Sequence, residues 1–165
     1  MTRFRYVALA VVALAVLLAA GYFRSDRRQV RRQLDGLAES ASMGAGASDI
    51  ERLARVARLA EFFTEDVIIR TSADNSVFVG GRRAVAAMAT QASAERRMLK
   101  VSLDDVEIEV TDATTATAAM TVVISSNGPD VESVDLREVS VTLRKENGVW
   151  LIAQAQVLPA RDRTP

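Results

Sequence analysis

The sequence predicts an α+β domain in which three helices pack against a curved, bulged and mainly antiparallel sheet, behind a single transmembrane helix. Three observations predict this fold class. Residues 6–23 form an uncharged, largely apolar run that is long enough to cross a bilayer. Residues 26–97 then alternate between helical and strand-like patterns. From residue 99 onward, apolar and polar residues alternate with the period of two that is typical of half-buried strands.

Length and composition exclude several classes of function. The chain has 165 residues, 21 basic and 21 acidic, with no cysteine and no histidine. A disulfide framework, a thiolate nucleophile and a histidine base or ligand are therefore excluded, and we predict no metal site and no cofactor. Residues 1–32 hold seven arginines against Asp26, so the rest of the chain is acidic. An acidic domain argues against a nucleic-acid partner, because binding phosphates requires a basic surface.

The tail over residues 1–24 contains the predicted membrane anchor. Its uncharged run, residues 6–23, would span about 27 Å as a helix, close to the thickness of a hydrocarbon core. Tyr6, Tyr22 and Phe23 lie at its ends, where aromatic rings favour the membrane interface. Two alternatives stay open: a cleaved signal peptide with a weak cleavage site, and a buried core helix.

We therefore expect a single-pass membrane protein, and the side on which its domain lies is undecided. Two arginines precede the apolar run and five follow it, which favours a cytoplasmic domain by the positive-inside rule. A short basic segment before an apolar run is, however, also how an export signal begins.

Residues 25–47 are predicted to form a basic juxtamembrane helix and a glycine-rich loop. Val30, Leu34, Leu37 and Ala41 recur at helical spacing and would form the buried stripe of the helix. The arginines around its start have two explanations. They could bind anionic lipid head groups, at about 1 kcal/mol each near the surface, or they could be a topology signal on a solvated face. These arginines are Arg24, Arg27, Arg28, Arg31 and Arg32.

Residues 48–160 are predicted to hold the remainder of the domain. Ser48 and Glu51 fit a capping box, which favours a helix that begins at residue 49. A strand over 67–71, a turn, a short strand and a third helix over 82–97 follow. The later strands are predicted over residues 99–110, 115–125, 134–143 and 149–158, with a turn at Asn147–Gly148 and a polar tail at 161–165.

The apolar positions change phase at Asp104–Asp105 and again at Arg137–Glu138. Because side chains alternate between the two faces of a strand, only an extra residue keeps both apolar sets on one face. We therefore predict a β-bulge at each place; the alternative is a break into two strands. The sets expected to share a face are Leu99, Val101, Leu103, Val106, Ile108 and Val110, and separately Val134, Leu136, Val139, Val141 and Leu143.

Three phrases occur in order within residues 26–158: EFFTEDVII (61–69), VGGRRAVAAMA (79–89) and NGVWLIAQAQV (147–157). With the elements between them, they resemble the NTF2-like superfamily, which includes ketosteroid isomerase-like and SnoaL-like polyketide-cyclase-like proteins. The resemblance implies a conical cavity closed by helices over a curved sheet, and often dimerisation through the sheet. It also implies that the enzymes of the family hold acid and base residues inside the cavity.

The resemblance places a catalytic aspartate near the end of the first strand, where this chain has Thr71. Threonine cannot accept a proton at neutral pH, and the histidine of many cyclase-like members does not occur here. We therefore expect no catalytic residue. Asp66 is interpreted as a residue of a helix-to-strand junction and Asp74 as a turn residue.

Four further side chains are candidates for ligand binding, together with Thr71. One carboxylate of Asp104–Asp105 is expected to point inward at the bulge, where burial would raise its pKa. Gln154 and Gln156 are expected to share a strand face with Trp150 and could offer hydrogen bonds to a ligand. The alternative for both glutamines is a solvated strand end.

The function predicted from these observations is that of a membrane-tethered, non-catalytic domain for protein interaction or dimerisation at the bilayer. One alternative is a cavity that binds a small apolar ligand or lipid, with weak enzymatic activity. A second is a scaffold subunit of a membrane assembly, since the bitopic scaffold of type IV secretion systems has a similar layout. A buried, unpaired carboxylate in the cavity would favour a ligand site, and a large exposed apolar face would favour an interaction or assembly role.

Overall fold

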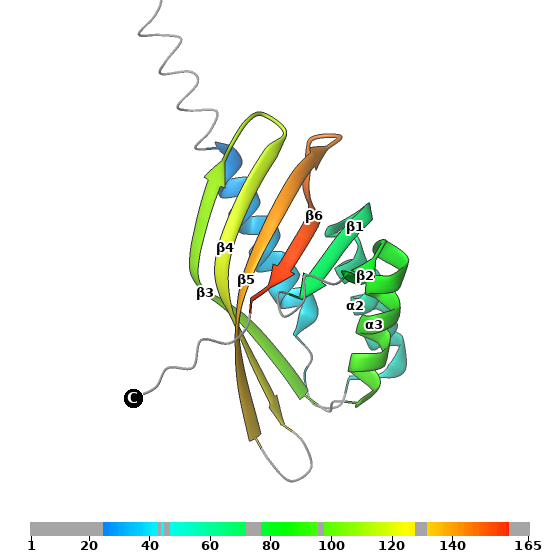
Figure 1. Ribbon diagram of the computed structural model, residues 1–165. Coiled ribbons are helices and arrows are strands. Elements are labelled where there is room, and N and C mark those ends of the chain that lie inside the picture. The colour runs from blue at the N-terminus through cyan, green and yellow to red at the C-terminus, as the bar shows by residue number, and fades with distance from the viewer. Residues whose placement is uncertain are drawn as a thin grey trace, which may run out of the picture.

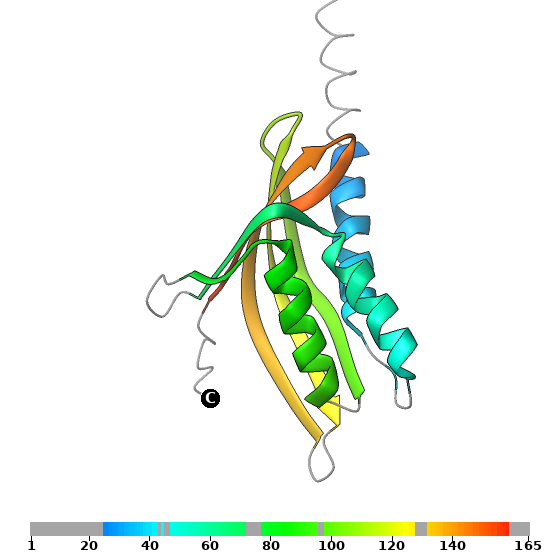
Figure 2. The same ribbon diagram turned by 90° about the vertical axis from the view of Figure 1, so that its right-hand side faces the viewer.

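The computed structural model describes residues 25–42, 44, 47–71, 77–95, 98–127 and 132–158. Three helices gather on one face of a curved sheet (Figure 2). The helices cover residues 25–41, Asp49–Ala60 (α2) and Arg82–Glu95 (α3). The strands are β1 (Phe63–Thr71), β2 (Val77–Gly80), β3 (Met98–Val110), β4 (Thr115–Asn127), β5 (Glu132–Glu146) and β6 (Val149–Val157).

The sheet has six strands in the order β2-β1-β6-β5-β4-β3 (Figure 1). All neighbouring strands are antiparallel except β1 and β6, which run parallel. The predicted α+β class, the order of the elements and the curved, mainly antiparallel sheet are therefore confirmed. Within the described part of the chain, no helix is long and apolar enough to cross a membrane, and the span predicted at residues 6–23 lies outside that part.

The helix over residues 25–41 is an integral part of the core. Val30, Leu34 and Ala38 are buried at a spacing of four residues, so one stripe of the helix faces the sheet. Gly36 lies against Phe62, whose ring would stand 3.2 Å from a Cβ at that position. Beyond the helix, the Ser42 hydroxyl accepts a hydrogen bond from the Val101 N–H at 3.0 Å and so attaches the chain to the edge of β3.

The helix α2 begins as its sequence predicts. The Ser48 side chain accepts a hydrogen bond from the Glu51 N–H, and the Glu51 carboxylate accepts one from the Ser48 N–H at 2.9 Å. This capping box satisfies two of the amide groups that a helix start leaves unpaired. The start of α3 follows Gly81, whose φ of 85° lies in the left-handed region that glycine adopts without strain.

One face of the sheet, here called the inner face, carries the apolar core under the helices. Its buried members come from β4, β5 and β6 and from two helices that cover them. They are Val30, Leu34, Val85, Ala116, Ala118, Met120, Val141, Leu143, Trp150, Ile152 and Ala155, joined by Phe63, Val67 and Val79.

The first predicted bulge is confirmed. Asp104 pairs with Thr121 and Glu107 with Ala119, so β3 uses one residue more than β4 between these two pairs. Asp105 has a φ of 51°, a left-handed conformation that marks the inserted residue. The predicted set on both sides of the bulge shares the inner face, because it lies opposite the even-numbered residues of β4 that include Ala116, Ala118 and Met120.

The second predicted bulge is wrong. The pairing of β5 with β4 runs without a shift from Glu132 to Arg144, through Arg137 and Glu138. Val139, Val141 and Leu143 therefore face inward, whereas Val134 and Leu136 face the opposite, outer side and are 60 % and 55 % exposed. The apolar positions change phase without an extra residue, because the apolar side chains lie on the covered inner face after residue 138 and on the exposed outer face before it.

Candidate functional site

The described core encloses one charged group, the carboxylate of Asp26 in the helix over residues 25–41. Its side chain is 2 % exposed and accepts a hydrogen bond from the Lys145 ammonium of β5, with 2.6 Å between Nζ and Oδ1. Lys145 lies on the inner face, opposite Trp150 of β6 in the strand register. The ion pair therefore joins the start of this helix to the β5–β6 hairpin across 119 residues of sequence.

Trp150 completes this cluster. The Lys145 ammonium lies 5.2 Å from the centre of the Trp150 ring, within the range of a cation–π contact. Two atoms of the cluster, Asp26 Oδ2 and Trp150 Nε1, are buried without a hydrogen-bond partner among the described residues. The cluster thus contains one hydrogen-bond acceptor and one donor that no described residue uses, next to a paired charge. Such an arrangement suits the recognition of a polar group.

Two surface depressions share Gln33 and Val149, and the first of them is also lined by Trp150 of this cluster. The first, about 280 Å³, is lined by Gln29, Arg32, Gln33, Gly148, Val149 and Trp150. The second, about 380 Å³, is lined by Gln33, Ser40, Arg58, Glu61, Phe62 and Val149. Together they form a groove between the helix over 25–41, the β5–β6 turn and the end of α2. Its mixed lining of apolar side chains and arginines suits an amphiphilic molecule or a peptide segment.

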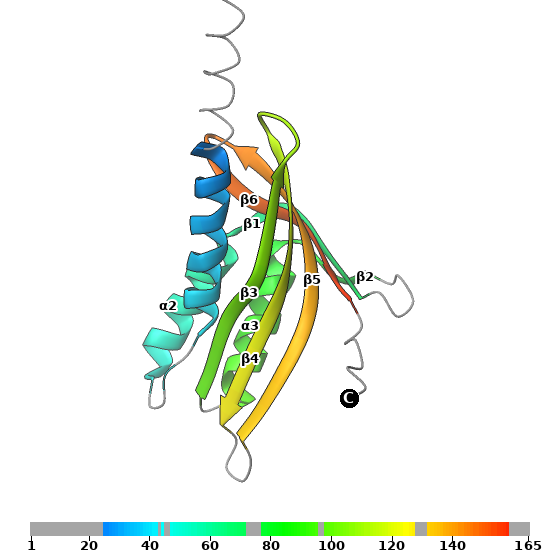
Figure 3. The ribbon, with the colours of Figure 1, turned by 90° about the vertical axis from the view of Figure 1, so that its left-hand side faces the viewer.

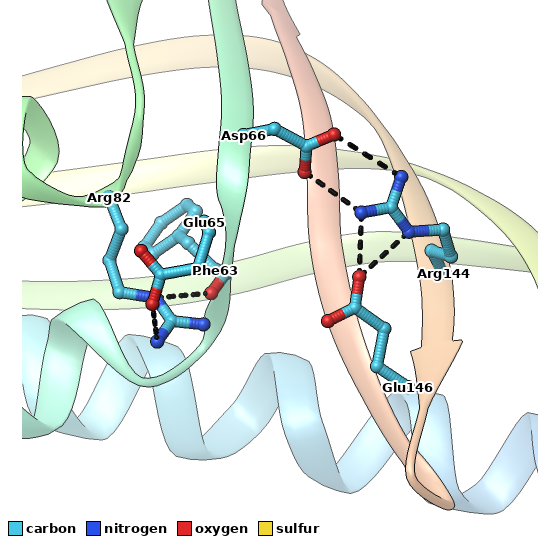
Figure 4. Close-up of polar contacts among 6 residues, drawn as sticks. All are labelled: Phe63, Glu65, Asp66, Arg82, Arg144 and Glu146. Carbon is cyan, nitrogen blue, oxygen red and sulfur yellow. Dashed lines mark hydrogen bonds and ion pairs between the residues drawn. The ribbon is translucent and has the colours of Figure 1, made fainter.

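The outer face of the sheet carries an ion-pair cluster that connects β1 with β5 across β6. Arg144 of β5 donates to the Asp66 carboxylate of β1 at 2.8 Å and to Glu146 at 2.6 Å (Figure 4). The hydrogen bond from Arg144 lowers the pKa of Asp66 below its usual value. Nearby, Arg82 of α3 donates to the Phe63 carbonyl at 2.8 Å and to Glu65 at 2.7 Å. These exposed pairs fasten α3 and β1 to the sheet, and Asp66 has a structural partner.

Asp104 and Asp105 are both exposed at the bulge of β3, so the expectation that one of them points inward is wrong. The reason is local: the inserted residue, Asp105, takes a left-handed conformation, and the bulge returns Val106 to the inner face.

Thr71 ends β1, with its backbone opposite Val157 of β6. No group of three or more acidic side chains in the described ranges could hold a metal ion.

The expectation that Gln154 and Gln156 share a face with Trp150 is also wrong. Thr142 pairs with Gln154 and Leu143 with Ile152, so Ala153 is an extra residue in β6. This bulge puts Ala155 on the inner face with Trp150 and turns both glutamines to the outer face. They lie there at half-buried positions opposite Thr142 and Ser140 of β5.

The described arginines of the predicted membrane-facing set lie on the exposed side of their helix. Arg27, Arg28, Arg31 and Arg32 are all exposed, and Arg31 pairs with Asp35 at 3.0 Å. Arg24 and Asp74 lie outside the described residues.

The buried ion pair was not predicted, although the sequence pattern indicates it. Asp26 has the helical spacing of the buried Val30 and Leu34, and Lys145 has the strand spacing of the buried Val141 and Leu143. Both patterns place a charged residue on a buried face, and the two charges are opposite.

Replacing Asp66 with asparagine is expected to make the stability of the domain less dependent on pH. Because the folded pKa of Asp66 lies below the unfolded value near 3.8, its contribution is present above that pH and is lost as the pH falls through the folded pKa. The difference in urea midpoint between the parent chain and D66N should therefore be largest at neutral pH and shrink below pH 3.8. Glu109→Gln, at an exposed site on β3, is the control; an equal difference at all pH values would contradict the prediction.

Comparisons with known proteins agree with this architecture. A family model for the SnoaL-like domain matches residues 47–156, and no curated protein matches the chain. An NTF2-like protein with a cystatin-like fold from Novosphingobium aromaticivorans has a TM-score of 0.69 at 18 % identity, over 92 % of each chain. A candidate scytalone dehydratase from the same organism has a TM-score of 0.69 at 15 % identity, over 84 % of this chain and 86 % of that one. A candidate dehydratase of the NTF2-like family from Streptomyces avermitilis has a TM-score of 0.65 at 18 % identity, over 83 % and 97 %.

Proposed function

The chain belongs to the SnoaL-like domain family, and on that premise we propose that it is a membrane-tethered, non-catalytic member that serves protein interaction or dimerisation at the bilayer. The observation that carries the proposal is the buried pair of Asp26 and Lys145. It supports both the attachment of the membrane-proximal helix to the domain and the absence of a free acid or base in the described core.

The tether is supported by the place of the helix over residues 25–41. Its start lies at the end of the sheet that also holds the β3–β4 and β5–β6 turns (Figure 1). An anchor at residues 6–23 would bring this end of the domain to the bilayer. The first two turns would then present Arg27, Arg28, Arg31 and Arg32 to the head groups, where cationic side chains are attracted by anionic lipids.

The non-catalytic role is supported by the charges of the described core. General acid–base catalysis needs a group that exchanges a proton with the substrate and is sheltered enough to have a tuned pKa. Asp26 is the one charged residue in the buried set of the described residues, and Lys145 holds one of its oxygens. Asp104 and Asp105 are exposed, and Thr71 stands where the resemblance places the base of the enzymes.

Binding of an apolar or amphiphilic small molecule is the second candidate. It is favoured by the groove between the helix over 25–41, the β5–β6 turn and α2, whose lining includes Phe62, Val149 and Trp150. Val149 is 49 % exposed there, which leaves apolar surface open to a ligand.

The full-length chain is expected to stay with the membrane fraction through washes with high salt and alkaline carbonate, because an inserted apolar helix resists both. Placing arginines at Leu14 and Leu17 should release the protein, since each charge at the centre of a span costs about 2.5–3.5 kcal/mol on insertion scales. Release of the parent chain by carbonate, or a mature protein that lacks residues 1 to about 21, would contradict the tether.

A further inference from the structure

The groove beside the helix over residues 25–41 has two ends that differ in charge. The helix lies next to the β5–β6 turn near its start and next to α2 further along (Figure 3). The two depressions of the groove share Gln33 and Val149, so they are continuous. The depression beside the β5–β6 turn is here called the turn end, and the one beside α2 is called the α2 end.

The turn end is basic, because its lining contains one cation and no acidic side chain. The cation is the guanidinium of Arg32, which lies with the half-buried amides of Gln29 and Gln33. Arg32 makes no ion pair with a described residue, whereas the adjacent Arg31 pairs with Asp35. The described hydrogen bond of Arg32 joins its Nε to a carbonyl of the preceding helical turn, which leaves the two terminal nitrogens for a ligand.

The turn end also includes a residue with a buried hydrogen-bond donor that no described residue uses. Trp150 lines this end, and its Nε1 has no acceptor among the described residues. Buried donors in proteins nearly always have an acceptor. The charge of the buried Asp26 is balanced by Lys145, and Glu146 is paired with Arg144. A carboxylate ligand supplies acceptors only, and it therefore matches an end of the groove that offers donors.

The α2 end of the groove combines apolar side chains with balanced charges. Phe62 is half-buried there, and Val149, which both ends share, is 49 % exposed. Arg58 and Glu61 are both exposed and lie three positions apart around the end of α2, so their charges offset each other. This end has no net charge to attract an anion, but its apolar surface would lose contact with water under an alkyl chain.

We propose that the groove binds a single-chain anionic amphiphile, a long-chain carboxylate of the fatty-acid class. Its carboxylate lies at the turn end, against the Arg32 guanidinium and the amides of Gln29 and Gln33. Its alkyl chain runs past Val149 to Phe62. Charge complementarity sets this orientation, because only the turn end has an unbalanced positive charge. The inference rests on the second candidate function above, since it names the ligand class of that same groove.

A free fatty acid fits the groove better than a lipid of the bilayer. Val149 is shared by both ends, with Trp150 at one end and Phe62 at the other, so the apolar lining is one continuous strip. One alkyl chain covers this strip, and a second chain would stay in water. A lipid that keeps its chains in the bilayer would bring only its head group and leave the strip uncovered.

The test uses the fluorescence of Trp150, the one tryptophan of the chain, which lines the turn end. The full-length chain is placed in phosphatidylcholine nanodiscs and titrated with tetradecanoate that carries bromine, a short-range quencher, either next to the carboxylate or at the far end of the chain. The first probe is expected to quench saturably and more strongly than the second. The uncharged 2-bromotetradecanol should bind about tenfold more weakly than the corresponding acid, because it lacks the charged hydrogen bonds to Arg32.

Two variants remove the same charge from opposite ends of the groove. Arg32→Gln should raise the dissociation constant of the first probe about tenfold, because the charged hydrogen bonds to the carboxylate are lost. Arg58→Gln is the matched control and should change that constant by about twofold or less, since an exposed charge at the other end is screened by salt. Both side chains are exposed, so both variants should keep the far-ultraviolet spectrum of the parent.

Four results would overturn the inference. Equal binding of the alcohol and the acid would leave the groove as a site for apolar molecules, and the second candidate function would stand. A larger loss in R58Q than in R32Q, or stronger quenching by the far bromine, would contradict the placement of the carboxylate. Loss of acid binding when phosphatidylglycerol is added to the discs would assign the turn end to bilayer head groups. If no probe quenches Trp150 saturably, the second candidate function falls together with the inference.

Discussion

Deleting Asp105 from the bulge of β3 is expected to destabilise the domain by about 2–5 kcal/mol, whereas Asp105→Gly should leave its stability unchanged or slightly raised. Without the inserted residue, three apolar side chains on one side of the bulge must turn to the outer face. Each contributes about 1.5–3 kcal/mol when fully buried, and these side chains are half-buried. Glycine adopts the φ of 51° at this position without strain.

The deletion is measured by urea unfolding of the full-length chain in mild detergent, followed by the fluorescence of Trp150. This residue is the one tryptophan of the sequence and is 2 % exposed, so its emission reports loss of the core. Asp105→Ala is the matched control that keeps the residue count, with an expected cost of about 1 kcal/mol. A deletion that costs no more than this alanine variant would contradict the role of the bulge.

Replacing Lys145 with methionine is expected to cost about 3–5 kcal/mol, because it leaves the Asp26 carboxylate buried and without its partner. The double variant Asp26→Leu with Lys145→Met should recover most of that loss, since an apolar pair of similar volume has no charge to desolvate. The same urea titration measures both variants.

Arg144→Met is the control for this second prediction. Arg144 precedes Lys145 on β5, but its ion pairs with Asp66 and Glu146 lie on the exposed outer face. Exposed pairs contribute about 0–1 kcal/mol each, so the R144M variant should unfold close to the parent. An equal loss in R144M and K145M, or no recovery in the double variant, would contradict the buried pair as the source of stability.

Features that depend on neighbouring residues could be predicted from the sequence. The capping box at Ser48 and Glu51 and the order of the elements follow from local hydrogen bonding and from hydrophobic periodicity, and both are confirmed. The bulge at Asp104–Asp105 was predictable because apolar residues on both sides of it face the same core. The family resemblance carried by residues 61–69, 79–89 and 147–157 is confirmed by the family match over residues 47–156.

Features that depend on where a neighbouring strand ends, or on which face of a strand is covered, could not be predicted in this way. The phase change at Arg137–Glu138 is the same in sequence as the one at Asp104–Asp105, but β5 extends past β6 and exposes Val134 and Leu136. A bulge that was not predicted lies in β6 at Ala153, where alanines at 153 and 155 give no phase signal. The faces of Gln154 and Gln156 therefore could not be predicted from the periodicity of their own strand.

The sequence by itself thus determined the fold class, the first bulge and the order of the helices and strands, because these follow from the periodicity and hydrogen bonding of neighbouring residues. The tertiary structure alone decided the faces of β5 and β6 and the pairing of Asp26 with Lys145. These depend on contacts across 119 residues of sequence and on where one strand ends beside another. Periodicity gives the relative orientation of side chains along a strand, whereas burial is decided by the neighbour that packs on each face.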